Sequence, residues 1–217
     1  MTIAPYTYDS LVSCSDPSFD EFYSIYEGSL PLRERKSKAQ ISAVISRPDY
    51  KTLLLKRNDV VIGFSMLFIA TEESFCLLEY MAIHPVYRNS GLGRELFLHT
   101  FQNVVVSDHG ASYGLLEVDS DREQSEDQEM RRRRQRFYRR LGCFRIDRLS
   151  YLLPLPGEGP PPQMNIMVYP PDRFLTISKH QLKQWLKVIY NKVYDCCPDD
   201  PRITKMMKYI GDPVKLL

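Results

Sequence analysis

The sequence contains no apolar run long enough to cross a membrane. Its longest nearly apolar stretch, Val60 to Ala70, includes Gly63 and Ser65 and falls well short of the roughly 20 residues that a bilayer-spanning helix needs. No segment resembles the apolar core of a secretory signal. We therefore predict a soluble, cytoplasmic protein that makes no use of a membrane.

Paired cysteines and an excess of one charge are also missing. The five cysteines form an odd set without the paired spacing of a metal site. Reduced thiols are the simplest interpretation, and we expect no bound metal. The net charge is +2, from 29 basic and 27 acidic residues, so the overall field favours neither nucleic acid nor an anionic membrane as a partner.

The sequence shows no internal repeat. Its length of 217 residues is suited to one domain with a smaller additional segment. The hydrophobic period predicts strands at residues 7–13, 51–57, 60–70, 75–83, 113–119, 144–153 and 164–169. Helices are predicted at 17–27 with Asp16 as N-cap, at 37–47 opened by Ser37, at 91–106, at 130–141, and at 179–194 with Ser178 as cap. The turn residues Asn58-Asp59 predict a hairpin between the second and third strands.

The stretch YRNSGLGREL, Tyr87 to Leu96, joins an apolar strand to a helix through a polar turn with two glycines. Glycines let backbone N–H groups converge where a helix begins, and the positive end of the helix attracts anions there. Arg88 and Arg94 add guanidinium groups that can bind phosphate in a bidentate manner. The turn lacks the Gly-Lys-Ser/Thr of a P-loop and the third glycine of the dinucleotide fingerprint. It therefore predicts a phosphate-binding turn of another kind.

Two segments together resemble the GNAT superfamily of acyl-CoA-dependent N-acyltransferases. EYMAIHPVYRNSGLGREL is similar to the segment between the family's fourth strand and third helix, whose signature is Arg or Gln, two residues, Gly, any residue, then Gly or Ala. Downstream, LLEVD and RFYRRLGC are similar to the fifth strand and the helix that follows it. The matches fall in the right order, and with the predicted elements they cover about Thr7 to Tyr169.

The resemblance implies an α/β (α+β) fold with a central mixed, mostly antiparallel, twisted sheet of about seven strands. In the family, this sheet is splayed between strands 4 and 5 and has helices on both faces. We expect residues 1–170 to form the acyltransferase domain. Residues 171–217 would form a C-terminal helical extension that packs on the same domain or at a homodimer interface.

Acetyl-CoA is the acyl donor that the resemblance implies, with no metal. Its pyrophosphate would bind the backbone amides of the glycine turn, and its pantetheine arm would hydrogen-bond the main chain of the fourth strand. The residues expected to bind the coenzyme are Met81, Ala82, Ile83, Arg88, Asn89, Ser90, Gly91, Leu92, Gly93 and Arg94.

Three side chains are candidates for proton transfer. Tyr138 matches the tyrosine whose phenol usually acts as general acid toward the sulfur of CoA. Glu117 stands where some family members carry their base, and Glu79 lies among apolar residues of the fourth strand, where burial would raise the pKa of a carboxyl. Glu117 is slightly favoured as the base, with Glu79 as the alternative. His84, just before Pro85, is interpreted as a loop residue and Cys143 as a small buried residue.

The acceptor is expected to be a primary amine on a small molecule or a peptide. In the family the first two helices shape the acceptor site, so the resemblance implies that the segment LPLRERK, which contains Arg33 and Arg35, contributes to acceptor specificity. Two other functions stay open. One is a catalytically silent acyl-CoA sensor, and the other is nucleic-acid binding through the basic helix Arg131–Arg140. For that helix, the Asp127–Arg131 and Glu129–Arg133 spacings favour a solvated face with internal ion pairs.

Overall fold

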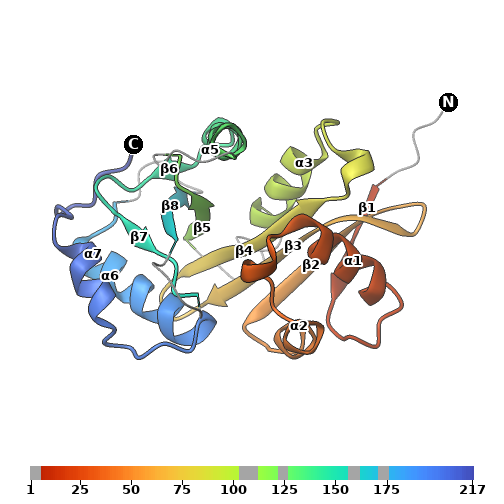
Figure 1. Cartoon of the computed structure of the whole chain (residues 1–217), viewed down its shortest axis with the longest axis horizontal. Helices are drawn as coiled ribbons and strands as arrows, with labels where there is room; N and C mark the ends of the chain where they lie inside the picture. The colour runs from red at the N-terminus through yellow and green to blue at the C-terminus, as the bar shows by residue number, and fades with distance from the viewer. Residues whose placement is uncertain (1–5, 103–111, 122–126, 156–161, 171–175) are drawn as a thin grey trace. The chain divides into compact units, whose positions relative to one another are not determined.

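The computed structural model describes residues 6–102, 112–121, 127–155, 162–170 and 176–217 (Figure 1). The chain divides into two units. The first comprises Met1–Ile69 and Leu78–Gly110, and the second comprises Ala70–Leu77 and Ala111–Leu217. Each unit is described by itself.

The first unit contains β1 (Tyr6–Leu11), β2 (Tyr50–Arg57), β3 (Val60–Ala70) and most of β4 (Phe75–Ile83). β1 pairs antiparallel with β2, and β2 pairs antiparallel with β3. Asn58 and Asp59 both have positive φ, 51° and 62°, as expected for the two residues of a tight hairpin turn. The predicted hairpin is therefore confirmed.

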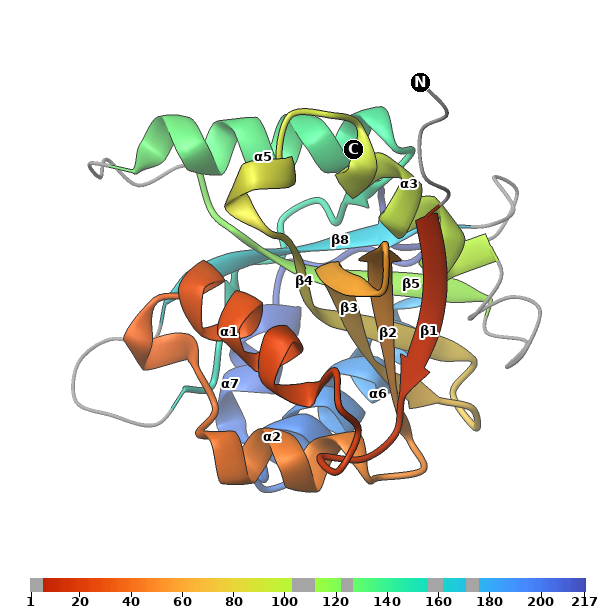
Figure 2. The ribbon, with the colours of Figure 1, turned by 90° about the vertical axis from the view of Figure 1, so that its right-hand side faces the viewer.

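Helices cover both faces of these strands. α1 (Phe19–Ser29), the 3₁₀ turn η1 (Leu32–Glu34) and α2 (Lys38–Ile45) lie on one face, and α3 (Leu92–His99) lies on the other (Figures 1 and 2). Neighbouring residues of β3 reach opposite faces, because Phe64 packs edge-on against Phe22 of α1, whereas Ser65 hydrogen-bonds Thr100 just after α3.

The helix starts were predicted with mixed success. Ser37 caps α2, and Gln40 completes a capping box. α1 begins at Phe19 with Ser18 as N-cap, so the prediction of Asp16 as its N-cap was wrong. Asp16 instead accepts a hydrogen bond from the Ser18 amide at 2.8 Å, in a turn that precedes the helix. The last predicted residues of the third helix, 103–106, lie outside the described residues.

The second unit contains β5 (Tyr113–Asp119), α5 (Gln128–Arg140), β6 (Phe144–Arg145), β7 (Tyr151–Leu152) and β8 (Gln163–Tyr169). The β5–β8, β6–β8 and β7–β8 pairs are antiparallel. The strand order of the sheet is β1-β2-β3-β4-β5-β8-β6, with β7 beside β8. The predicted α/β class with a mostly antiparallel sheet is confirmed. The single strand predicted at 144–153 is two short strands, and Arg148 between them has a φ of 59°.

The C-terminal part of the second unit is helical. It contains α6 (Lys179–Val188), the π-helical segment η4 (Ile189–Val193) and α7 (Pro201–Met207). Ser178 caps α6 as predicted. Trp185 of α6 is 1% exposed, packs against Phe75 and Tyr113, and donates its indole N–H to the Glu73 carbonyl at 3.1 Å. The apolar side of α6 is thus buried within the chain, and the proposed boundary at residue 170 stays a prediction.

Candidate active site

The glycine turn builds an uncapped helix N-terminus in the first unit. Gly91 is the N-cap of α3 and has a left-handed φ of 87°, and no side chain caps the helix. Its carbonyl accepts the amides of Arg94 and Glu95 at 2.9 and 3.2 Å. Leu92 and Gly93 lie between Gly91 and Arg94. Their amides come before the first hydrogen bond within the helix, so they have no carbonyl partner inside it. The turn can therefore offer backbone N–H groups and a positive helix end to an anion.

The two arginines of the turn already have partners in the first unit. Arg88 Nε donates to the Ile83 carbonyl at 2.8 Å, and its Nη2 donates to Ser29 Oγ at 3.3 Å. Arg88 therefore links the turn to the end of β4 and to α1. Arg94 is well exposed and pairs with Glu95 at 2.9 Å. Both arginines are exposed, so each guanidinium can also meet a phosphate from solvent.

The end of β4 is packed closely against β3. A Cβ added to Gly63 of β3 would lie 2.6 Å from Ile83 Cδ1 and 3.0 Å from the Ala82 carbonyl oxygen. A side chain at this position would require the Ile83 side chain to move and the Ala82 carbonyl to shift slightly. Met81 packs against the cluster that contains Ile83 and Leu92. These contacts fix the end of the strand that was predicted to carry the pantetheine arm.

Glu79, also on β4, lies at the centre of a polar cluster that we call the Glu79 cluster: Glu79, Lys36, Tyr26, Tyr50 and Tyr80. The Glu79 side chain is 2% exposed, and its carboxylate forms an ion pair with the Lys36 ammonium. The Tyr50 hydroxyl donates to Glu79 Oε2 at 2.8 Å. Lys36 Nζ also donates to the Tyr80 hydroxyl at 3.3 Å and lies 5.2 Å from the centre of its ring. A buried carboxylate is thus compensated by one cation and one phenol.

The Glu79 cluster departs from the alternation of side chains along a regular β-strand. Glu79 and Tyr80 are consecutive, yet both reach the ammonium of Lys36, whereas consecutive side chains of a regular strand point to opposite faces. Sequence reasoning missed Lys36, because no local pattern links it to a carboxylate 43 residues away. It did select the segment LPLRERK, which ends at Lys36.

The tyrosines of the Glu79 cluster are neutral donors at physiological pH. Burial raises the pKa of Tyr26 to about 12. Burial, and then the negative charge of Glu79, raise the pKa of Tyr50 and that of Tyr80 still further. Tyr26 also fixes the backbone of Lys36, because its hydroxyl accepts the Lys36 amide at 2.7 Å. The cluster therefore holds a primary ammonium between a carboxylate and protonated phenols.

Glu117 and Tyr138 belong to the second unit. Glu117 lies on β5 opposite Ile166 of β8, and its two carboxylate oxygens accept the hydroxyls of Tyr151 and Tyr194. Burial, followed by the charge of Glu117, raises the pKa of Tyr151 well above its usual value. Glu117 is therefore bound to protonated phenols that come from β7 and from the residue after η4.

Tyr138 lies on α5 next to Phe137, with which it makes an edge-on ring contact. Burial raises the pKa of Tyr138 to about 12, although the positive charge of Arg134 opposes this. The phenol therefore keeps its proton at neutral pH. Cys143 is 3% exposed, and burial raises the pKa of its thiol to about 12, which confirms that it is a small buried residue.

The β4 strand with its glycine turn, and the pair Glu117 and Tyr138, lie in a segment that is similar to a known protein family. A sequence model of the acetyltransferase (GNAT) domain matches residues 48–142, which include β4, the glycine turn, Glu117 and Tyr138. By this match, residues 48–142 are similar to a GNAT acetyltransferase domain. No curated protein matches the sequence.

Solved structures share the GNAT fold. An acetyltransferase of the GNAT family from Bacteroides thetaiotaomicron superposes with a TM-score of 0.71 at 20% identity, over 88% of this chain and 99% of its own. The ribosomal-protein-S18-alanine N-acetyltransferase of Escherichia coli gives 0.55 at 20% identity, over 79% and 99%. An aminoglycoside 6′-N-acetyltransferase complexed with coenzyme A gives 0.58 at 16% identity, over 76% and 96%. GNAT enzymes use acetyl-CoA and act on amine acceptors.

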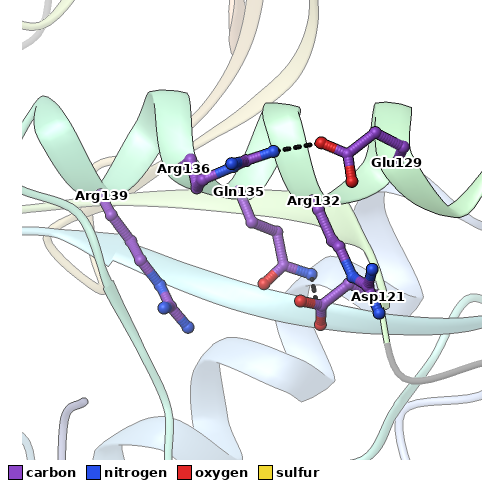
Figure 3. A pocket seen from close by; sticks show the side chains of 6 residues that line it. All are labelled: Asp121, Glu129, Arg132, Gln135, Arg136 and Arg139. Atoms are coloured by element: carbon purple, nitrogen blue, oxygen red, sulfur yellow. Dashed lines mark hydrogen bonds and ion pairs between the residues drawn. The ribbon is translucent and has the colours of Figure 1, made fainter.

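The basic helix α5 of the GNAT domain lines a hollow of about 360 Å³ in the second unit (Figure 3). Asp121, Glu129, Arg132, Gln135, Arg136 and Arg139 form its walls. Arg131 pairs with Asp127 at 3.0 Å, which confirms the first of the two predicted i,i+4 pairs. Glu129 of the second predicted pair is in an ion pair with Arg136. Carboxylates therefore offset part of the positive charge of this helix.

Within residues 6–102, 112–121, 127–155, 162–170 and 176–217, no helix combines the length and apolarity needed to cross a membrane. The same ranges contain no group of three or more His, Cys, Asp or Glu side chains that could hold a metal ion.

Proposed function

We propose that the protein is an N-acetyltransferase that moves an acetyl group from acetyl-CoA to a primary amine by direct attack in a ternary complex. The observation that carries this proposal is the uncapped N-terminus of α3 at the left-handed Gly91, within a matched GNAT domain. Such a helix end is suited to the pyrophosphate of a coenzyme.

The expected coenzyme-binding residues all belong to the first unit. The pyrophosphate would bind Arg88, Asn89, Ser90, Gly91, Leu92, Gly93 and Arg94, and the pantetheine arm would bind Met81, Ala82 and Ile83. Since the glycine turn follows the C-terminal end of β4, an arm that starts there must run backwards along the strand. It would pass Ile83 and then Met81, and its thioester end would come level with Glu79 and Tyr80.

We assign the base to Glu79 rather than to Glu117. Glu79 already pairs with a primary ammonium, that of Lys36, and the acceptor presents the same chemical group. It also lies on the strand that would carry the pantetheine arm. Glu117, which the sequence slightly favoured, accepts hydrogen bonds from two phenols, whereas Glu79 accepts from one phenol and one ammonium. The ordinary role of such a carboxylate is to anchor the side chains that donate to it.

Tyr138 is the proposed acid. A leaving thiolate must be protonated or stabilised for the acyl group to depart. A phenol with a pKa of about 12 is fully protonated at neutral pH and can donate a hydrogen bond to the sulfur.

The experiment that tests the proposed activity is release of free thiol from acetyl-CoA with a panel of primary amines, amino acids, polyamines, aminoglycosides and peptides. At least one acceptor should raise thiol release well above the rate of hydrolysis without acceptor. Tight binding of acetyl-CoA without thiol release from any acceptor would contradict the proposal and favour a silent acyl-CoA sensor.

A matched pair of glycine variants tests the coenzyme site. Gly91 and Gly142 both have left-handed φ, 87° and 92°, and an added Cβ meets nothing within 4 Å at either. Gly91→Ala and Gly142→Ala should therefore each lower the free energy of unfolding by about 1–2 kcal/mol. Only Gly91→Ala should also weaken CoA binding, by about 10- to 100-fold if hydrogen bonds to the charged pyrophosphate are lost. Isothermal titration measures the affinities, and equal affinities in the two variants would rule out this site.

A further inference from the structure

We propose that Lys36 is itself an acyl acceptor, so that the domain acetylates Nζ of its own Lys36. This inference rests on the proposed function, because it uses the same donor and the same base. It assigns a modification site and gives a reason for the ion pair at the centre of the Glu79 cluster.

Lys36 presents its amine where an acceptor has to be. Its Nζ contacts Glu79, the proposed base, and donates to Tyr80 at 3.3 Å. Its backbone amide is held by Tyr26, so the side chain enters from a fixed point. The Lys36 side chain is 20% exposed, whereas that of Glu79 is 2% exposed. The amine is therefore shielded from bulk water but not sealed off.

The proposed path of the coenzyme leads to the same point. An arm that runs backwards from the glycine turn passes Ile83 and Met81 before it reaches the level of Glu79. Lys36, Glu79 and these strand residues all belong to the first unit. A thioester at the level of Glu79 would lie next to an amine that is already positioned, and such positioning can raise the rate of acyl transfer by orders of magnitude.

Lys38 supplies an internal comparison only two residues away. Its side chain is 56% exposed, and its ammonium pairs with Asp20 at 2.7 Å and lies over the rings of Phe19 and Tyr23. Lys38 therefore has a carboxylate and aromatic neighbours, but not those of the Glu79 cluster. Chemical acetylation without catalysis would favour the more exposed Lys38, and acetylation by the domain would favour Lys36.

The reaction balances with acetyl-CoA as the only co-reactant. Glu79 removes one proton from the Lys36 ammonium, and the neutral Nζ attacks the thioester carbonyl. The N–C bond forms and the C–S bond breaks, so that the sulfur leaves as a thiolate that takes one proton. Nζ loses two protons in succession, and Glu79 passes on the first before it takes the second; one of the two balances the proton gained by the thiolate and the other goes to water. The products are the N-acetyl-lysine, free CoA and one proton.

Acetylation of Lys36 would remove the cation that pairs with Glu79. An amide cannot form that ion pair, so the carboxylate would be open to the ammonium of a second acceptor. Lys36 would thus occupy the acceptor position until it is modified.

The test is to incubate the full chain with isotopically labelled acetyl-CoA and to follow label at Lys36 and Lys38 by peptide mass spectrometry. Lys36 should be labelled at least about 10-fold faster than Lys38, with a first-order rate that does not depend on protein concentration. Glu79→Gln should abolish the preference, and thermal melting should verify that this variant is folded. A chain that is purified with Lys36 already acetylated, but not in Glu79→Gln, counts as support.

Other outcomes separate this inference from the proposed function. Label at Lys38 as fast as at Lys36 would overturn self-acetylation. So would an unlabelled Lys36 in protein that releases thiol with a free amine, and in that case the proposed function stands. No label and no thiol release with any acceptor would overturn both.

Discussion

Replacement of Glu79 by Gln should lower kcat/KM for amine acetylation by about 100- to 10,000-fold, the range expected when a general base is removed. Glutamine has nearly the same shape, but it cannot accept the proton of an acceptor ammonium. Affinity for CoA should change by less than about 3-fold, since the predicted contacts of the coenzyme lie further along β4 and in the glycine turn. Thiol release at saturating acetyl-CoA measures the first quantity, and titration measures the second.

Glu117→Gln is the matched control for Glu79→Gln. It replaces the other candidate carboxylate and weakens its hydrogen bonds with Tyr151 and Tyr194. We expect a loss of stability of about 1–3 kcal/mol and a loss of kcat/KM below about 10-fold. The opposite pattern, with turnover abolished in Glu117→Gln and retained in Glu79→Gln, would return the role of base to Glu117.

Tyr138→Phe should lower kcat by about 100-fold or more and leave the KM for acetyl-CoA nearly unchanged, because the lost proton matters only as the sulfur departs. The pKa of about 12 adds a second expectation. The phenol keeps its proton below about pH 11, so no fall of kcat between about pH 7 and 10 should arise from Tyr138. The wild-type profile over that range, compared with that of the variant, measures this directly.

Tyr113→Phe is the control for the loss of a buried phenol from the second unit. Tyr113 is 4% exposed, and its hydroxyl donates to the Thr176 carbonyl at 3.4 Å. This variant should lose some stability and little kcat. If both variants reduce kcat equally, or if Tyr138→Phe keeps full activity, the phenol of Tyr138 is a packing group and not the acid.

Local signals in the sequence were sufficient for much of the fold. The Asn58-Asp59 turn, the Ser37 and Ser178 caps and the Gly91 helix start each depend on a few neighbouring residues, so pattern reasoning could find them. α7 was missed although Asp200 caps it and Pro201 opens it, a typical helix start. Its seven residues are too few for a clear periodicity.

The contacts of the candidate site could not be predicted in the same way. The partners of Glu79 come from the segment after α1 and from the start of β2, and those of Glu117 come from residues 34 and 77 positions later. Only the folded chain brings these side chains together. The sequence could therefore select two carboxylates by strand position, but it could not identify the side chains that contact each of them.

The close approach of Gly63 to Ile83 couples the sizes of these two residues. Any side chain at position 63 would enter space that Ile83 Cδ1 and the Ala82 carbonyl already fill, so a larger residue there requires a smaller one at 83 or an outward shift of β4. In homologous chains, gain of bulk at the first position should accompany loss of bulk at the second. The same constraint makes this strand end a poor site for engineering by single substitutions and a suitable one for paired exchanges.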